Sequence, residues 1–157
     1  MRELQIVDAA ELATAYAAAD YVVVLDGDSL PLRVGLPATD LEAYAPAARY
    51  AFITAWNPAS QPRSDSANEA ADALLVAQLD AIGAVRHPAW AQDPDGGWRE
   101  PGWLVVGLGE DDLLRLGLEF GQAGVLDWHA GEPVRLRMLM PRPSAAFGVA
   151  NTEWVAG

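Results

Sequence analysis

The clearest strand of this chain is predicted at Tyr50-Ala51-Phe52-Ile53-Thr54-Ala55-Trp56, because aromatic and β-branched side chains are typical of strands. Asn57-Pro58 follows it and favours a turn. After a polar loop, Ser66 and Glu69 have capping-box spacing, which predicts the start of a helix. The apolar stripe of this helix ends before Gly83 and consists of Ala67, Ala71, Leu74, Leu75, Leu79 and Ile82.

On the N-terminal side of this unit, an apolar face at helical spacing predicts a helix over residues 9–19. Residues 21–25 are apolar, residues 30–34 resume an extended pattern, and the turn sequence between them predicts a hairpin. Thr39 and Glu42 form a second possible capping box, which predicts a short helix.

On the C-terminal side, residues 84–91 and 103–108 read as extended. Three carboxylates at residues 110–112 favour a helix start, and this helix ends before Gly121. Residues 124–128 and 133–140 predict a second hairpin. Polar and apolar residues alternate along the second of these segments, so one face of the hairpin is expected to contact water.

The order of these elements predicts a single domain over residues 1–157 with an α+β fold: a two-layer sandwich in which a mixed or antiparallel sheet carries helices mainly on one face. The core is expected at about residues 9–140. Residues 141–157 show no clear period, so a loosely structured tail is expected there.

The composition excludes several classes of function. The chain has 157 residues, with 22 acidic and 10 basic side chains and a net charge of −12, which repels nucleic acid and anionic membranes, so neither is expected as a partner. It lacks cysteine and lysine, which excludes thiolate nucleophiles and Schiff-base chemistry. No apolar run reaches the length of a membrane span and no secretory signal is visible, so a cytoplasmic protein is expected.

The best candidate site is the segment that enters the central helix. It contributes the polar side chains of Asn57, Ser60, Arg63, Ser64 and Asn68. Free N–H groups at a helix N-terminus favour an anion, so a phosphate or carboxylate ligand is one reading. In the alternative reading, Asn57 makes a turn, Ser64 or Ser66 caps the helix, and Arg63 pairs with a surface acid.

Glu100 is the candidate catalytic residue, since Trp98 and Trp103 beside it would raise its pKa if their rings excluded water. An exposed glutamate at a strand start fits equally well. Gln122 is a candidate ligand-binding residue, and its alternative role is to bond loop backbone.

No metal site is predicted. Asp93, Asp95 and Glu100 offer oxygen ligands, but Gly97 interrupts the spacing of a calcium loop, and a solvated turn explains these acids better. His87 and His129 have no partner at metal-ligand spacing. No cofactor is identified.

Four groups of motifs follow one another along the chain: Leu32-Arg33-Val34-Gly35; Phe52-Ile53-Thr54-Ala55-Trp56-Asn57-Pro58-Ala59-Ser60 with Ser64 and Asn68; Asp93-Pro94-Asp95-Gly96-Gly97-Trp98-Arg99-Glu100 leading into Leu104-Val105-Val106-Gly107; and Phe120-Gly121-Gln122-Ala123. In these motifs the chain resembles the bacterial domain-of-unknown-function family 3293 over roughly residues 16–139. The resemblance implies no activity. Pro101-Gly102-Trp103 departs from it, because a small polar residue is expected shortly after Glu100.

Two functions follow as hypotheses. The first is a site for a small polar ligand, phosphorylated or nucleotide-like, formed by the polar segment together with Glu100 and Gln122. It requires that these groups face one cleft. The second is a non-catalytic interaction or accessory domain that uses part of its six tryptophans as a partner surface and can form a homo-oligomer.

Overall fold

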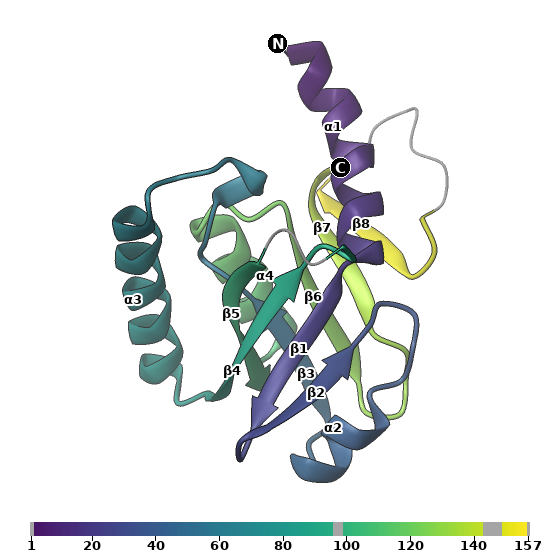
Figure 1. Ribbon diagram of the computed structural model, residues 1–157, viewed down its shortest axis with the longest axis vertical. Helices are drawn as coiled ribbons and strands as arrows, with labels where there is room; N and C mark the ends of the chain where they lie inside the picture. Colours follow the sequence, from purple (N-terminus) through teal and green to yellow (C-terminus); the bar gives the residue numbers. More distant parts are fainter. Residues whose placement is uncertain (1, 96–98, 143–148, 157) are drawn as a thin grey trace.

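A computed structural model describes residues 2–95, 99–142 and 149–156, in which four helices surround one sheet (Figure 1). The elements follow in the order α1 (Arg2–Ala18), β1 (Asp20–Leu25), β2 (Asp28–Leu32), α2 (Thr39–Tyr44), β3 (Arg49–Ile53), the 3-10 turn η1 (Pro58–Ser60), α3 (Asp65–Ile82), β4 (Val85–Gln92), β5 (Arg99–Val106), α4 (Glu110–Glu119), β6 (Gly124–His129), β7 (Arg135–Pro141) and β8 (Thr152–Ala156). None of these helices, as far as the chain is described, is long and apolar enough to cross a membrane.

The eight strands form one sheet in the order β2-β1-β4-β5-β3-β6-β7-β8. Neighbours pair antiparallel except β7 and β8, which are parallel, so the sheet is mixed. The predicted α+β class and mixed sheet are confirmed. Strand β8 lies within the segment for which the sequence indicated no regular element.

Strand β3 lies inside the sheet, between β5 and β6, and both of its faces are covered. Tyr50 and Phe52 belong to a first core, which α1 and α2 help to close. Ala51 and Ile53 belong to a second core beneath α3 and α4. A strand buried on both faces needs apolar residues at nearly every position, which explains its continuous apolar sequence.

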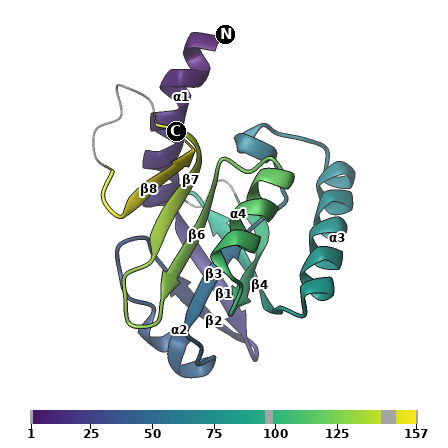
Figure 2. The same ribbon diagram turned by 180° about the vertical axis from the view of Figure 1, so that it is seen from behind.

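Helices α3 and α4 share one face of the sheet, and α1 packs on the other side (Figure 2). The close approach of α4 to strand β7 depends on Gly117, since a Cβ atom there would lie 2.3 Å from Leu139 Cδ1. The bare surface expected at this glycine is therefore filled by a leucine from β7.

Two predicted capping boxes are wrong. Helix α3 is capped by Ser64, whose hydroxyl accepts a hydrogen bond from Ala67 N at 3.2 Å, and not by Ser66. Thr39 is the first residue of α2 and does not cap it. Glu42 instead accepts hydrogen bonds from Trp128 Nε1 at 3.0 Å and from Gly131 N at 2.9 Å, so it ties α2 to the β6–β7 hairpin.

The hairpin face that was expected to contact water is occupied by an ion network. Asp127 is fully buried and pairs with Arg135 at 2.7 Å and with Arg137 at 3.0 Å. Glu110 at the start of α4 also accepts a hydrogen bond from Arg137, which lowers the pKa of its carboxyl group. Charged residues alternate along this strand because they meet opposite charges there.

Candidate functional site

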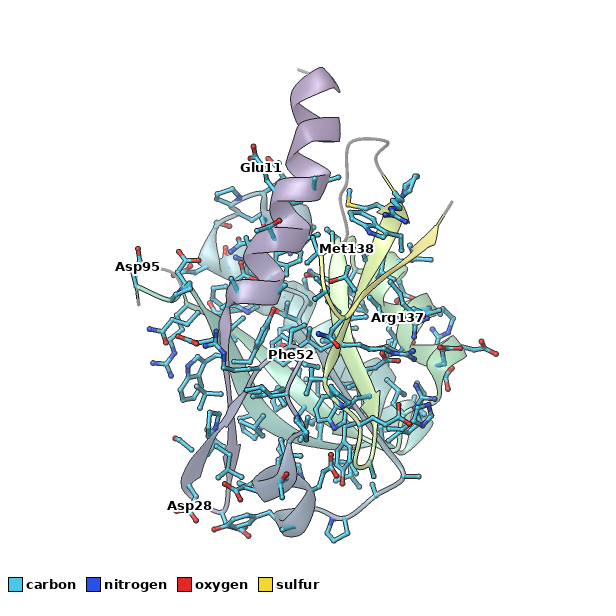
Figure 3. The ribbon with its side chains drawn as sticks, turned by 90° about the vertical axis from the view of Figure 1, so that its right-hand side faces the viewer. Glu11, Asp28, Phe52, Asp95, Arg137 and Met138 are labelled. Atoms are coloured by element: carbon cyan, nitrogen blue, oxygen red, sulfur yellow. The ribbon has the colours of Figure 1, made fainter. Side chains whose placement is uncertain are left out.

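A cavity of about 50 Å³ lies where α1, the end of β3, the start of β5 and the segment before β6 meet. In Figure 3, Phe52 lies inside the molecule near the C-terminal end of α1, whereas Asp95 projects at the edge. The residues that line the cavity are Tyr16, Tyr21, Phe52, Thr54, Asn57, Ala91, Glu100, Gln122, Gly124, Val125, Leu126 and Leu136.

Strand register places Glu100 beside the end of β3. Ile53 pairs with Trp103, so residues before Trp103 lie opposite those that follow Ile53. Asn57 reaches across and donates a hydrogen bond from Nδ2 to Glu100 Oε2 at 3.3 Å. The acid and the amide, which the sequence placed in separate motifs, therefore belong to one cavity.

Gly102 allows this close packing. A Cβ atom on it would lie 2.8 Å from Ile53 O and 2.9 Å from Phe52 Cζ, so the Phe52 ring lies where a side chain at this position would be. This glycine belongs to the Pro101-Gly102-Trp103 departure from the family pattern. The departure thus has a packing role.

A pair of hydroxyl groups closes the α1 side of the cavity. Tyr16 Oη and Ser60 Oγ lie 2.8 Å apart, and the hydroxyl of Tyr21 donates to the Tyr16 carbonyl at 2.7 Å. Burial raises the pKa of both tyrosines, and the negative charge of Glu100 raises them further. Both hydroxyls therefore stay protonated at neutral pH.

Gly124 leaves room for the Tyr16 ring, because a Cβ atom at this residue would lie only 3.2 Å from Tyr16 Cδ2. The sequence analysis did not select Tyr16, Tyr21 or Thr54 as site residues. Thr54 lies inside the motif that starts at Phe52, which was the one available signal for it. Tyr16 and Tyr21 lie outside the quoted motifs, and the contact between α1 and β6 is long-range, so no local pattern selects them.

Asn57, Arg63 and Asn68 hold the loop between β3 and α3 together. Asn57 N donates to Asn68 Oδ1 at 2.9 Å, and Asn68 Nδ2 donates back to Asn57 Oδ1 at 2.9 Å. The guanidinium of Arg63 donates to Ala55 O at 3.0 Å and to Asn68 Oδ1 at 3.2 Å. Arg63 thus bonds this loop, and not the surface acid of the alternative reading.

The proposed polar groups divide into two sets. Asn57, Glu100 and Gln122 line the cavity, and Ser60 reaches it through Tyr16. The other three lie outside it: Arg63, Ser64 and Asn68. Gln122 is buried and donates from Nε2 to Trp56 O at 3.1 Å, so it has the backbone-bonding role and also faces the cavity.

Trp103, one of the two tryptophans expected to shield Glu100, does not lie beside the carboxylate. Trp103 lies three residues from Glu100 along β5, on the opposite face, and packs against the second core. Its Nε1 donates to Asp72 Oδ1 at 2.8 Å. Trp98 and Gly97 lie outside the described residues.

A larger hollow of about 640 Å³ separates α3 from α4. Its lining consists of Pro58, Arg63, Ala71, Leu74, Ala77, Gln78, Ala81, Glu119, Phe120 and Gly121. Leu74 is 64% exposed. Of the tryptophans in the described part of the chain, Trp128 is buried and the other four are half-buried: Trp56, Trp90, Trp103 and Trp154.

Metal-binding side chains do not gather in the described residues. Among residues 2–95, 99–142 and 149–156, no group of three or more His, Asp or Glu side chains is placed to hold a metal ion. Asp93 and Asp95 are exposed.

Comparison with known proteins gives one match. Residues 53–125 match the model of a family described as "Protein of unknown function (DUF3293)", which confirms the resemblance seen in the motifs. The matched segment includes Asn57, Glu100 and Gln122. No curated protein and no solved structure matches the chain.

Proposed function

We propose that this chain, whose residues 53–125 belong to that family of unknown function, binds a small polar ligand in the cavity beside Glu100. One observation carries the proposal. Asn57, Glu100 and Gln122 come from three segments far apart in the sequence, and all line this cavity, where Asn57 Nδ2 and Glu100 Oε2 are 3.3 Å apart.

The character of the cavity supports binding. Its walls are mostly apolar and aromatic, with a few polar groups, which is the usual composition of a small-molecule site. A space of about 50 Å³ holds only a few non-hydrogen atoms, so the proposed ligand inserts one polar group and leaves its remainder outside.

A phosphorylated ligand is less well supported than a polar one without phosphate. The guanidinium of Arg63 already bonds Ala55 and Asn68, and it borders the other hollow. Glu100 would repel a phosphate in the cavity. The proposed function is binding, and Glu100 is the acidic group that the ligand would contact. The sequence predicts that this takes place in the cytoplasm.

A thermal-shift screen tests this function, because a ligand that prefers the folded state raises the melting temperature. The screen contains amines, amino acids, polyols, nucleotides, sugar phosphates and divalent metals. Ala91→Val serves as the blocking variant, since Ala91 lines the cavity and valine suits a strand.

We expect at least one compound to stabilise the wild type and to lose this effect in Ala91→Val. Ala73→Val, on the exposed side of α3, is the matched control and keeps the effect. A screen without any stabilising compound, or a stabilisation that Ala91→Val leaves intact, contradicts the proposal.

The hollow between α3 and α4 favours a second candidate function, the docking of a basic amphipathic helix from another protein. Leu74 is exposed there, and three alanines in the lining allow a close approach. The lining holds one basic and one acidic side chain, Arg63 and Glu119. Helix α3 beside it carries acidic side chains at 65, 69, 72 and 80 and no basic one, and the chain as a whole has a net charge of −12. A basic partner is therefore electrostatically favoured over a second copy of this acidic chain.

A further inference from the structure

We propose that the ligand group held in the cavity is a primary ammonium, bound by the carboxylate of Glu100. This inference rests on the proposed function and adds the chemical class of the ligand. It comes from the hydrogen bonds that the lining residues already make.

The donors around the cavity largely serve protein acceptors. The Tyr21 hydroxyl donates to Tyr16 O at 2.7 Å, and the Thr54 hydroxyl donates to Pro101 O at 2.6 Å. Gln122 Nε2 donates to Trp56 O at 3.1 Å. The cavity therefore offers a ligand few donors, and a ligand that needs to accept several hydrogen bonds is poorly matched.

The charge of the residues that line the cavity also favours a cationic ligand. Glu100 is the one formally charged residue among those that line the cavity in the described part of the chain. Its Oε2 accepts a hydrogen bond from Asn57, which fixes the position of the carboxylate. A carboxylate held in a largely apolar site favours a cation with N–H donors.

The remaining walls suit a cation. Tyr21 and Phe52 meet edge to face, with ring centroids 5.3 Å apart, and both line the cavity. Aromatic rings attract an ammonium group through their quadrupole. The net charge of −12 also attracts cationic ligands from a distance.

Size selects within the cations. A cavity of about 50 Å³ has room for an ammonium with its attached methylene, while an aromatic ring needs more. The inferred ligand is therefore an amine with a flexible or exposed remainder.

A titration followed by ¹H–¹⁵N NMR separates this inference from the proposed function. The probes are methylammonium, methanol, formate and inorganic phosphate, added at constant ionic strength. The signals are the side-chain amides of Asn57 and Gln122, which both line the cavity. We expect methylammonium to shift both signals in a saturable way, and the other three to have at least tenfold weaker effects.

Two variants test the role of the carboxylate. Glu100→Gln keeps the shape and removes the charge, so we expect at least a tenfold loss of methylammonium affinity. Glu132→Gln, an exposed acid in the β6–β7 turn, is the control and leaves the affinity unchanged. The comparison among probes on the wild type stands even if Glu100→Gln fails to fold.

The outcomes are distinct. Saturable shifts by methanol, formate or phosphate without methylammonium binding overturn the ammonium inference and leave the proposed function in place. Equal methylammonium binding by the wild type and Glu100→Gln also overturns it. If none of the four probes shifts the Asn57 and Gln122 signals, the inference is wrong, and the broader screen decides the proposed function.

Discussion

Asn68 Nδ2 donates to Asn57 Oδ1 while Asn68 Oδ1 accepts from Asn57 N, each over 2.9 Å, so two amides separated by eleven residues form a closed pair. The pair fixes the chain where β3 turns into α3. It also fixes the direction of Asn57, whose remaining donor reaches Glu100.

Replacing Asn68 with alanine should strongly destabilise the protein. Asn68 is buried, and its loss leaves the amide N of Asn57 without its side-chain acceptor. We expect a loss of about 2–4 kcal/mol in the free energy of unfolding, measured by urea denaturation. Asn68→Asp, which keeps the acceptor and removes the donor, should cost less. A loss below about 0.5 kcal/mol in Asn68→Ala would show that the pair does not hold the loop.

Ser64→Ala and Ser66→Ala should differ. Ser64 caps α3 and both side chains are exposed, so only the first substitution removes a cap. We expect Ser64→Ala to cost about 1 kcal/mol by chemical denaturation, and Ser66→Ala clearly less. A larger loss of stability in Ser66→Ala than in Ser64→Ala would show that Ser66 caps the helix, as the sequence pattern predicted.

Acid should weaken the contact between α4 and the sheet. The hydrogen bond from Arg137 lowers the pKa of Glu110 in the folded protein below its ordinary value of 4.5. Its contribution to stability is thus present above about pH 4.5 and lost as pH falls through the lowered pKa. Glu110→Gln should flatten the pH dependence of the melting temperature in this acidic range. Glu132→Gln is the control, and an unchanged slope in Glu110→Gln would contradict the assignment.

Gly117→Ala should destabilise the protein although alanine is the better helix former. The added Cβ atom would lie 2.3 Å from Leu139 Cδ1, whereas helix propensity alone would stabilise by about 1 kcal/mol. We expect a net loss of about 1–3 kcal/mol by denaturation. In a double-mutant cycle with Leu139→Ala, the two effects should be less than additive. Full additivity of the two effects would show that residues 117 and 139 do not interact.

Leu74→Gln tests whether the hollow between α3 and α4 binds an amphipathic helix. Leu74 is 64% exposed, so we expect little change in stability. The variant should bind a designed lysine- and leucine-rich amphipathic peptide at least tenfold more weakly than the wild type, measured by fluorescence anisotropy. Leu36→Gln, at another exposed leucine, is the matched control. An equal loss in both variants would mean that the peptide binds without selecting the hollow.

Local sequence patterns were enough to predict most of the helices and strands and the class of the fold, but not strand β8. Residues 50–56 predicted a strand, and β3 occupies Arg49–Ile53, because aromatic and β-branched side chains mark a buried strand locally. The stripe before Gly83 predicted α3, whose C-cap Gly83 has a φ of 81°. These patterns repeat over a few residues, so short-range chemistry is enough to identify them.

Which side chains meet depends instead on how distant segments pack together. It paired β3 with β5, which brought Glu100 to Asn57, and it packed α1 so that Tyr16 reached Ser60. Strand order and register depend on contacts between distant segments, which a local pattern does not contain. The same reason explains Arg137: alternation along a strand shows that a face is polar, but whether water or a buried carboxylate such as Asp127 meets that face depends on what packs over it.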